Sequence, residues 1–182
     1  MKKVEDACHL QDENGLRDRA VILLLTRLGL RASDVANLNL QDIDWNNGQI
    51  LVSGKSRRQE WLPLPQEVGD AIIGYLKRGR PKLKINQIFT KVDAPIGPLT
   101  RASVTHIVRS AFLRAGVKPP VNGNGAHTLR HSAATAMLRS GVSLSGVSTV
   151  LRHRLSNTTN IYAKVDFGQL SKVAQPWPGV KS

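Results

Sequence analysis

The amino-acid sequence predicts a mainly α-helical domain that carries one small three-stranded antiparallel β-sheet. Apolar residues recur at helical spacing in most segments, whereas residues 42–64 change to short apolar runs separated by turn signals. The chain has 182 residues, of which 41% are hydrophobic and 21% charged, which is ordinary for a globular domain. That length suits one domain and is enough to bury a core without disulfides.

The N-terminal part is predicted to hold two helices after a flexible lead-in. Residues 1–13 are polar and weakly patterned, which favours a flexible segment. Residues 16–30 place their leucines mostly on one side, as an amphipathic helix does. Ser33 is a good N-cap for a short second helix that runs to about Leu38.

The sheet is predicted in the segment that follows, as three short strands at residues 43–45, 49–52 and 60–64. Asn-Asn-Gly at positions 46–48 is a strong turn signal between the first two strands. The second turn, residues 54–59, is rich in Lys and Arg. The pattern therefore indicates an antiparallel meander with a basic tip.

The second half of the chain is predicted to return to helices, joined by loops over residues 79–98 and 116–125. A short strand is expected at residues 87–89, and Thr100 is a candidate N-cap. The expected helices are 66–77, 100–115, 128–140, 143–151, 156–163 and a tail helix over 166–175.

The charge balance favours a polyanionic partner. Lys and Arg number 26 against 13 Asp and Glu, which gives a net charge of +13. Such an excess favours nucleic acid, because neutralised phosphates release their counterions. A basic surface kept for solubility, a ribosomal protein or a membrane-surface binder would show the same excess.

The number of cysteines and the hydropathy of the chain exclude several classes of protein. Cys8 is the single cysteine, which excludes an internal disulfide framework and a Cys-rich zinc site. A reducing, intracellular compartment fits this usage. The sequence has no apolar stretch of membrane-spanning length and begins without the apolar run of a signal peptide.

The densest polar cluster is His-Thr-Leu-Arg-His at positions 127–131. His127 and Arg130 are three residues apart, so a helix places them on one face, while His131 lies on the neighbouring face. Histidine and arginine both donate hydrogen bonds to the non-bridging oxygens of a phosphate. The alternative is a helix start with incidental polar residues.

A second cluster ends in a candidate nucleophile. His153 precedes Tyr162 by nine residues, and Tyr75 is the other of the two tyrosines. A tyrosine can attack a phosphodiester and hold the strand as a phosphotyrosyl ester. The alternative is a core tyrosine whose hydroxyl bonds to the backbone.

Two further basic residues lie where they could reach a phosphate. Arg31 lies at a turn between helices, and Asp34, three residues on, could hold its guanidinium. Lys55 lies on the expected hairpin tip and could protonate a leaving oxygen as a general acid. The alternatives are a surface arginine near a helix C-terminus and a solvated turn lysine.

Taken in order, the strings GLRxSD, GK on a hairpin, HxLRH, LxH and TTxIY resemble the tyrosine recombinases, or phage integrase family. The resemblance covers about residues 14–178 and is most specific from His127 to Tyr162. It implies the catalytic-domain fold of that DNA breaking-rejoining class. It also implies a site-specific recombinase or integrase of a mobile element, encoded by bacteria or phage and acting on double-stranded DNA in the cytoplasm.

The resemblance also assigns roles at the reacting phosphate. Arg31 and Arg130 would be the paired arginines on the scissile phosphate. Lys55 would be the general acid, and Tyr162 would be the nucleophile that forms a 3′-phosphotyrosyl intermediate. The chemistry of the family needs no metal, ATP or other cofactor.

The remaining roles fall on histidines and one carboxylate. His127 and His153 would orient and polarise the phosphate. Asp34 matches the acidic position after the first arginine, and His131 matches a frequent supporting histidine. Arg152 stands where the family usually has glycine, which puts the geometry beside His153 in question.

The family pattern extends to partners and organisation. Members act as tetramers, and the tail helix, with Phe167, Leu170 and Val173 on one face, is expected to dock on a neighbouring subunit. The usual N-terminal DNA-clamp domain is expected to be absent, because nothing before residue 14 could form one. Candidate DNA-backbone contacts are Arg57, Arg58, Arg101, Arg109, Arg152 and Arg154.

The alternative functions are a type IB topoisomerase-like relaxing activity and a non-catalytic DNA-binding module.

Overall fold

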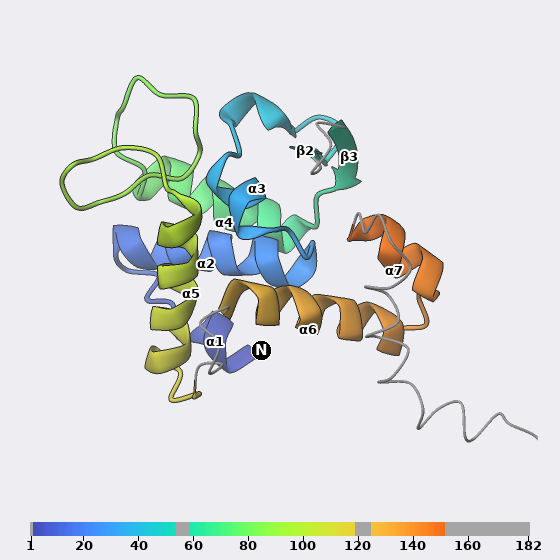
Figure 1. The fold of residues 1–182 in the computed structure, drawn as a ribbon. Helices are drawn as coiled ribbons and strands as arrows, with labels where there is room; N and C mark the ends of the chain where they lie inside the picture. The colour runs from blue at the N-terminus through green and yellow to red at the C-terminus, as the bar shows by residue number, and fades with distance from the viewer. Residues whose placement is uncertain (1, 54–58, 119–124, 152–182) are drawn as a thin grey trace, which may run out of the picture. The chain divides into compact units, whose positions relative to one another are not determined.

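The computed structural model describes residues 2–53, 59–118 and 125–151 (Figure 1). The chain divides into two units, Met1–Ala133 and Ala134–Ser182, each with its own packing. In chain order the described elements are α1 (Lys2–Asp6), α2 (Glu13–Arg27), α3 (Ala32–Ala36), the 3-10 helix η1 (Leu40–Asp42), β1 (Ile43–Asp44), β2 (Gln49–Ser53), β3 (Gln59–Pro63), α4 (Gln66–Arg78), α5 (Arg101–Arg114), α6 (Gly125–Arg139) and α7 (Leu144–Val150). The predicted class, mainly helical with one three-stranded antiparallel sheet, is confirmed. Within the described ranges no helix is both long and apolar enough to cross a membrane.

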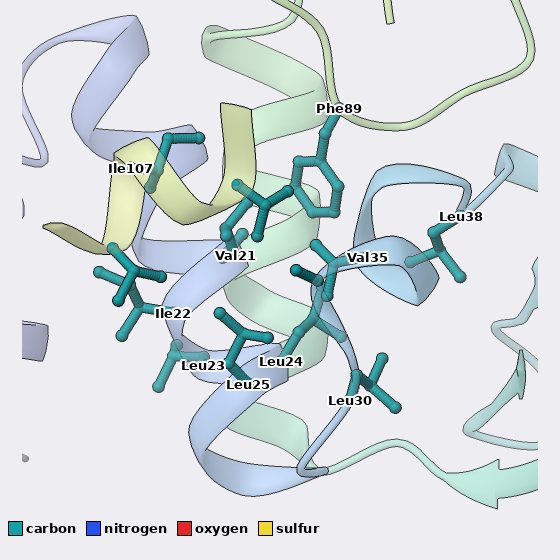
Figure 2. Close-up of a cluster of buried hydrophobic side chains, with 14 of the residues drawn as sticks. Val21, Ile22, Leu23, Leu24, Leu25, Leu30, Val35, Leu38, Phe89 and Ile107 are labelled. Atoms are coloured by element: carbon teal, nitrogen blue, oxygen red, sulfur yellow. The ribbon is translucent and has the colours of Figure 1, made fainter. Parts of the chain in front are cut away.

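Helix α2 forms the centre of the first unit. All six residues from 20 to 25 are fully buried, at 0% exposure. Helices α3, α4 and α5 pack against it, and Figure 2 shows Val35 and Ile107 of these helices, with Phe89 from a loop, around its side chains. A helix that is apolar on every side is a core helix. The sequence predicted an amphipathic helix with one apolar side. In the structure the neighbouring helices cover residues 20–25 on all sides.

The N-terminal residues are ordered against this core, unlike the flexible lead-in predicted over residues 1–13. Val4 and Cys8 are buried, and Glu5 forms an ion pair with Arg27 of α2 at 2.8 Å. Close packing continues at Gly15, where an added Cβ would lie 1.6 Å from the carbonyl oxygen of His9. These partners come from α2, so the local sequence pattern does not reveal them.

The sheet is an antiparallel meander in the order β1-β2-β3, as predicted. Gly48, with φ of 61°, occupies the first turn in the left-handed region that glycine adopts easily. Ile50 and Val52 of β2 face the core, while Leu51 pairs with Trp61 of β3 on the other face. The second turn, with its basic residues, lies outside the described residues.

Side-chain caps mark the starts of α2, α5 and α7. The Thr100 side chain accepts a hydrogen bond from the backbone nitrogen of Ser103 at 3.1 Å, so the predicted start of α5 is confirmed. Helix α3 begins two residues earlier than a cap at Ser33 would place it, because Arg31 rather than Ser33 is its N-cap. The strand predicted at 87–89 was wrong: the structure has isolated bridges there, one of them Asn39 to Gln87.

Helix α6 begins at Gly125, three residues before its predicted start, so His127 lies inside its first turn. In the second unit the later part of α6 is followed by α7, whose N-cap Ser143 accepts from the backbone nitrogen of Gly146. These two helices bury a small cluster of Ala134, Val147 and Leu151. The helices predicted over 156–163 and 166–175 lie outside the described residues.

Candidate functional site

The side chain of Arg130 is directed to the turn that carries Arg31. Arg130 is 6% exposed, and its Nη1 donates a hydrogen bond to the carbonyl oxygen of Gly29. Gly29 has φ of 58°, and this left-handed conformation turns the chain at the end of α2. Arg31 follows two residues later. The structure therefore brings together two arginines that the sequence separates widely.

Arg31 is held in turn by the helix that it caps. The carboxylate of Asp34 accepts a hydrogen bond from the backbone nitrogen of Arg31 at 3.1 Å and lies 4.0 Å from its Nη1. The Asp34 side chain is 9% exposed and that of Arg31 30%. A carboxylate in the first turn satisfies a free N–H group of the helix and attracts the guanidinium as well. The predicted partnership of these two residues is confirmed.

A pocket of about 260 Å³ opens beside Arg31. One wall is formed by α3 and the segment after it, and the other wall by β2. The lining residues are Arg31, Ser33, Asp34, Asn37, Leu38, Asp42, Leu51, Val52 and Ser53. Ser53 is the last described residue before the turn with Lys55, so the strand leading to that lysine lies beside Arg31. Lys55, Arg57 and Arg58 themselves lie outside the described residues.

The first turns of α6 present His127 and His131 on either side of Arg130 in sequence. The two imidazole rings meet edge to face, with 4.1 Å between their centroids. His127 is exposed and His131 half-buried. Burial lowers the pKa of His131 below its ordinary value, and the neighbouring His127 and Arg130 lower it further. His131 is therefore biased toward the neutral imidazole, which can accept as well as donate a hydrogen bond.

Two other potentially nucleophilic side chains, Tyr75 and Cys8, are buried in the core. Tyr75 is fully buried, its hydroxyl lies 3.0 Å from the Thr90 hydroxyl, and its ring stacks on Phe89. Burial, and then the charge of Asp18, raise the pKa of the Cys8 thiol to about 11. Neither group can act on an external substrate in this structure. The other tyrosine, Tyr162, lies outside the described residues.

The sequence-predicted site residues thus fall into two groups. Arg31, Asp34, His127, Arg130 and His131 are described, and all belong to the first unit. The candidate DNA contacts Arg101 and Arg109 are exposed on α5. The predicted residues outside the described ranges are Lys55, Arg57, Arg58, Arg152, His153, Arg154 and Tyr162.

Sequence reasoning missed the part that Gly29 plays. A glycine just after a run of helical leucines signals a left-handed residue at the helix end. That signal locates the turn but does not reveal that its carbonyl accepts from Arg130. Among the described residues, no three His, Cys, Asp or Glu side chains gather in a way that could hold a metal ion.

Comparison with known proteins places the whole arrangement in context. A family model described as the phage integrase family matches residues 1–169. The protein y4rA of Sinorhizobium fredii, an integrase/recombinase by name, is 48% identical over 166 residues, which is 91% of this chain and 40% of y4rA. The tyrosine recombinase XerC of Halalkalibacterium halodurans is 34% identical over 181 residues, covering 95% of this chain and 58% of XerC. The chain thus spans between 40% and 58% of the length of these two relatives.

Solved structures agree on the fold. The XerH site-specific recombinase bound to a palindromic difH substrate, in a post-cleavage complex, has a TM-score of 0.78 at 25% identity and covers 98% of this chain and 51% of XerH. The XerA recombinase has a TM-score of 0.77 at 23% identity, with 94% of this chain and 60% of XerA covered.

Proposed function

Because the chain belongs to the phage integrase family, we propose that it is the catalytic part of a site-specific DNA recombinase. It would cut and rejoin strands of double-stranded DNA through a 3′-phosphotyrosyl intermediate. The observation that carries the proposal is the hydrogen bond from Arg130 to the carbonyl of Gly29, which brings the two arginines of the family pattern to one turn. The pocket beside Arg31 supports the proposal, because it would leave room for a phosphate next to that arginine.

The chemical problem is to break a stable phosphodiester bond. In the proposed first step the hydroxyl of Tyr162 gives up its proton to solvent, its oxygen attacks the scissile phosphorus, and the P–O bond to the 5′ oxygen breaks. The leaving oxygen takes its proton from Lys55 as general acid. In the rejoining step a 5′ hydroxyl returns its proton to Lys55 and attacks the phosphotyrosyl ester, and Tyr162 leaves and regains a proton from solvent. The bond is exchanged rather than hydrolysed, so no ATP is needed.

The other site residues would stabilise the charge that develops on the phosphoryl oxygens. Arg31 and Arg130 would donate to the non-bridging oxygens, and His127 and His153 would add further donors. Donors fixed before the reaction need no reorganisation during it, so the contacts made by Asp34 and Gly29 matter for rate. In this proposal His131 supports His127, whose ring it contacts.

The proposal extends to assembly. Strand exchange between two DNA sites needs several active subunits on one synapse. The residues Phe167, Leu170 and Val173 recur at helical spacing and could dock a tail helix on a neighbour in a homotetramer. Deleting residues 165–182 should then abolish strand exchange between two sites while single-site cleavage remains.

The covalent step is tested with nicked suicide duplexes. After cleavage the short fragment beyond the nick diffuses away, so the adduct is trapped. The central region is randomised because the target sequence is unknown. The unmodified chain should give protein–DNA adducts that survive a denaturing gel. Tyr162→Phe should give none, because phenylalanine has no nucleophile. Tyr75→Phe is the matched control and should keep its adducts, since Tyr75 is buried. Adducts that survive in Tyr162→Phe would contradict the proposal.

A further inference from the structure

A second basic surface lies away from the residues proposed for catalysis. From residue 71 to residue 92 the chain has no Asp or Glu and six Lys or Arg residues. Four of these six are exposed in the structure, and we call them the α4-end basic cluster: Lys77, Arg78, Lys82 and Lys84. The first two lie in the last turn of α4 and the other two in the loop that follows. The cluster therefore concentrates positive charge within eight residues.

These four cations differ from several other arginines of the same unit, which form ion pairs. Arg27 pairs with Glu5 and Glu67, and Arg114 pairs with Asp18. No ion pair within the described ranges involves any member of the cluster. The cluster consequently presents its charge outward to a partner in solution.

The loop that carries Lys82 and Lys84 is held in a fixed shape. The guanidinium of Arg80 donates to the carbonyl oxygens of Ile85 at 2.8 Å, Gln87 at 3.0 Å and Ile88 at 3.1 Å. The same loop is tied to the segment after α3, because the nitrogen of Leu40 donates to the carbonyl of Asn86 at 2.8 Å. An ordered backbone loses little entropy when its side chains bind, so Lys82 and Lys84 can bind a partner at a low entropic cost.

Helix electrostatics explain only part of this cluster. Cations in the last turn of a helix are stabilised by its dipole, which accounts for Lys77 and Arg78. The dipole acts within the last turn and does not reach Lys82 and Lys84. Holding four like charges together in ordered structure is unfavourable unless a polyanion offsets the repulsion.

We infer that the α4-end basic cluster binds the phosphate backbone of double-stranded DNA, as a contact additional to the site around Arg31 and Arg130. The inference rests on the proposed function, since it is the DNA substrate that the cluster would hold. Lysine binds phosphate as a point charge and reads no base sequence there. The cluster lies at the end of α4 away from β3, and 13 helical residues span about 20 Å. It would therefore contact backbone phosphates other than the reacting one.

The test removes charge from the cluster without touching the proposed catalytic residues. The triple variant Lys77→Gln, Lys82→Gln, Lys84→Gln is compared with a control variant carrying Lys2→Gln, Lys3→Gln and Lys118→Gln. All six lysines are exposed, so both variants lose the same charge with little effect on folding. The probe is a mixed-sequence duplex of about 30 base pairs, and its affinity is measured by fluorescence anisotropy from about 50 to 200 mM KCl.

The slope of log affinity against log salt reports the number of phosphate contacts. Each lost contact lowers its magnitude by about 0.9, so the cluster variant should lose roughly 2 to 3. The control variant should lose less than about 1. Equal losses in both variants would mean that only net charge matters, and an unchanged slope would mean that the cluster binds nothing; either result overturns the inference. If the unmodified chain fails to bind the duplex at all, the proposed function itself fails.

Discussion

The guanidinium of Arg130 donates to the backbone carbonyl of Gly29, so one glycine at the end of α2 both turns the chain toward Arg31 and receives the other arginine. The contact joins residues that are 101 positions apart in sequence. It is made inside the protein, where the group that accepts it cannot be removed by changing a side chain. The conformation of Gly29 is thus a determinant of where the guanidinium of Arg130 lies.

Gly29→Ala should strain this turn, because a side chain at φ of 58° costs roughly 1–2 kcal/mol. We expect the free energy of unfolding in urea to fall by about that amount, and adduct formation to fall further than the stability loss explains. Gly29→Asn tolerates the left-handed conformation and should recover much of both. If alanine and asparagine behaved alike, the conformation of Gly29 would not be what positions Arg130.

Arg130→Lys should slow adduct formation by about 10²–10³-fold, the usual cost of losing one preorganised donor to a developing charge. Lysine keeps the charge but cannot donate to Gly29 and a phosphate in the planar geometry of a guanidinium. Single-turnover trapping on suicide duplexes measures the rate. The exposed Arg139, changed to lysine, is the control and should leave the rate within a few-fold.

Asp34→Asn should distinguish two effects of Asp34: its charge beside the Arg31 guanidinium and its hydrogen bond to the backbone nitrogen of Arg31. Asparagine keeps an oxygen that can accept from the backbone nitrogen of Arg31, but it loses the charge beside the guanidinium. We expect little change in stability and about a tenfold drop in adduct formation, equivalent to ~1.4 kcal/mol. Asp34→Ala should lose about 1 kcal/mol of stability as well. A normal cleavage rate in Asp34→Asn would show that the carboxylate charge does not hold Arg31 for the reaction.

The Glu5–Arg27 pair should make stability depend on pH. Burial alone would raise the pKa of the Glu5 carboxyl, but hydrogen bonds and the charge of Arg27 outweigh burial and hold it below the ordinary 4.5. A lowered pKa contributes stability above 4.5 that is lost as the pH falls through the folded-state value. The difference in unfolding free energy between the unmodified protein and Glu5→Gln should therefore be largest near neutral pH and shrink below 4.5. Glu60→Gln, at an exposed carboxyl, is the control for the substitution itself.

Local signals predicted much of the fold. Thr100 and the Asn-Asn-Gly turn at 46–48 mark element boundaries through contacts within a few residues, and the structure has those boundaries. The packing of the lead-in could not be predicted, because its partners are distant in sequence: Glu5 pairs with Arg27, and Arg114 donates to the carbonyl of Ala7. Spacing within a segment carries no trace of such contacts.

In the candidate site, too, contacts between residues close in sequence could be predicted, and contacts between distant residues could not. The pairing of Arg31 with Asp34 follows from their spacing at a helix start and could be predicted from the sequence. The approach of Arg130 to that turn could not, because only the fold brings α6 to the end of α2. The family pattern places both arginines in one site without giving the backbone carbonyl that fixes one of them.

The complete burial of residues 20–25 in α2 also has a consequence for synthesis on the ribosome. Its run from residue 20 to residue 25 leaves the ribosome before α5, which covers part of it and ends at Arg114. At about 5–20 residues per second the run waits roughly 5 to 20 seconds for that cover. During this interval it is six consecutive apolar residues on a nascent chain, the kind of segment that chaperones bind.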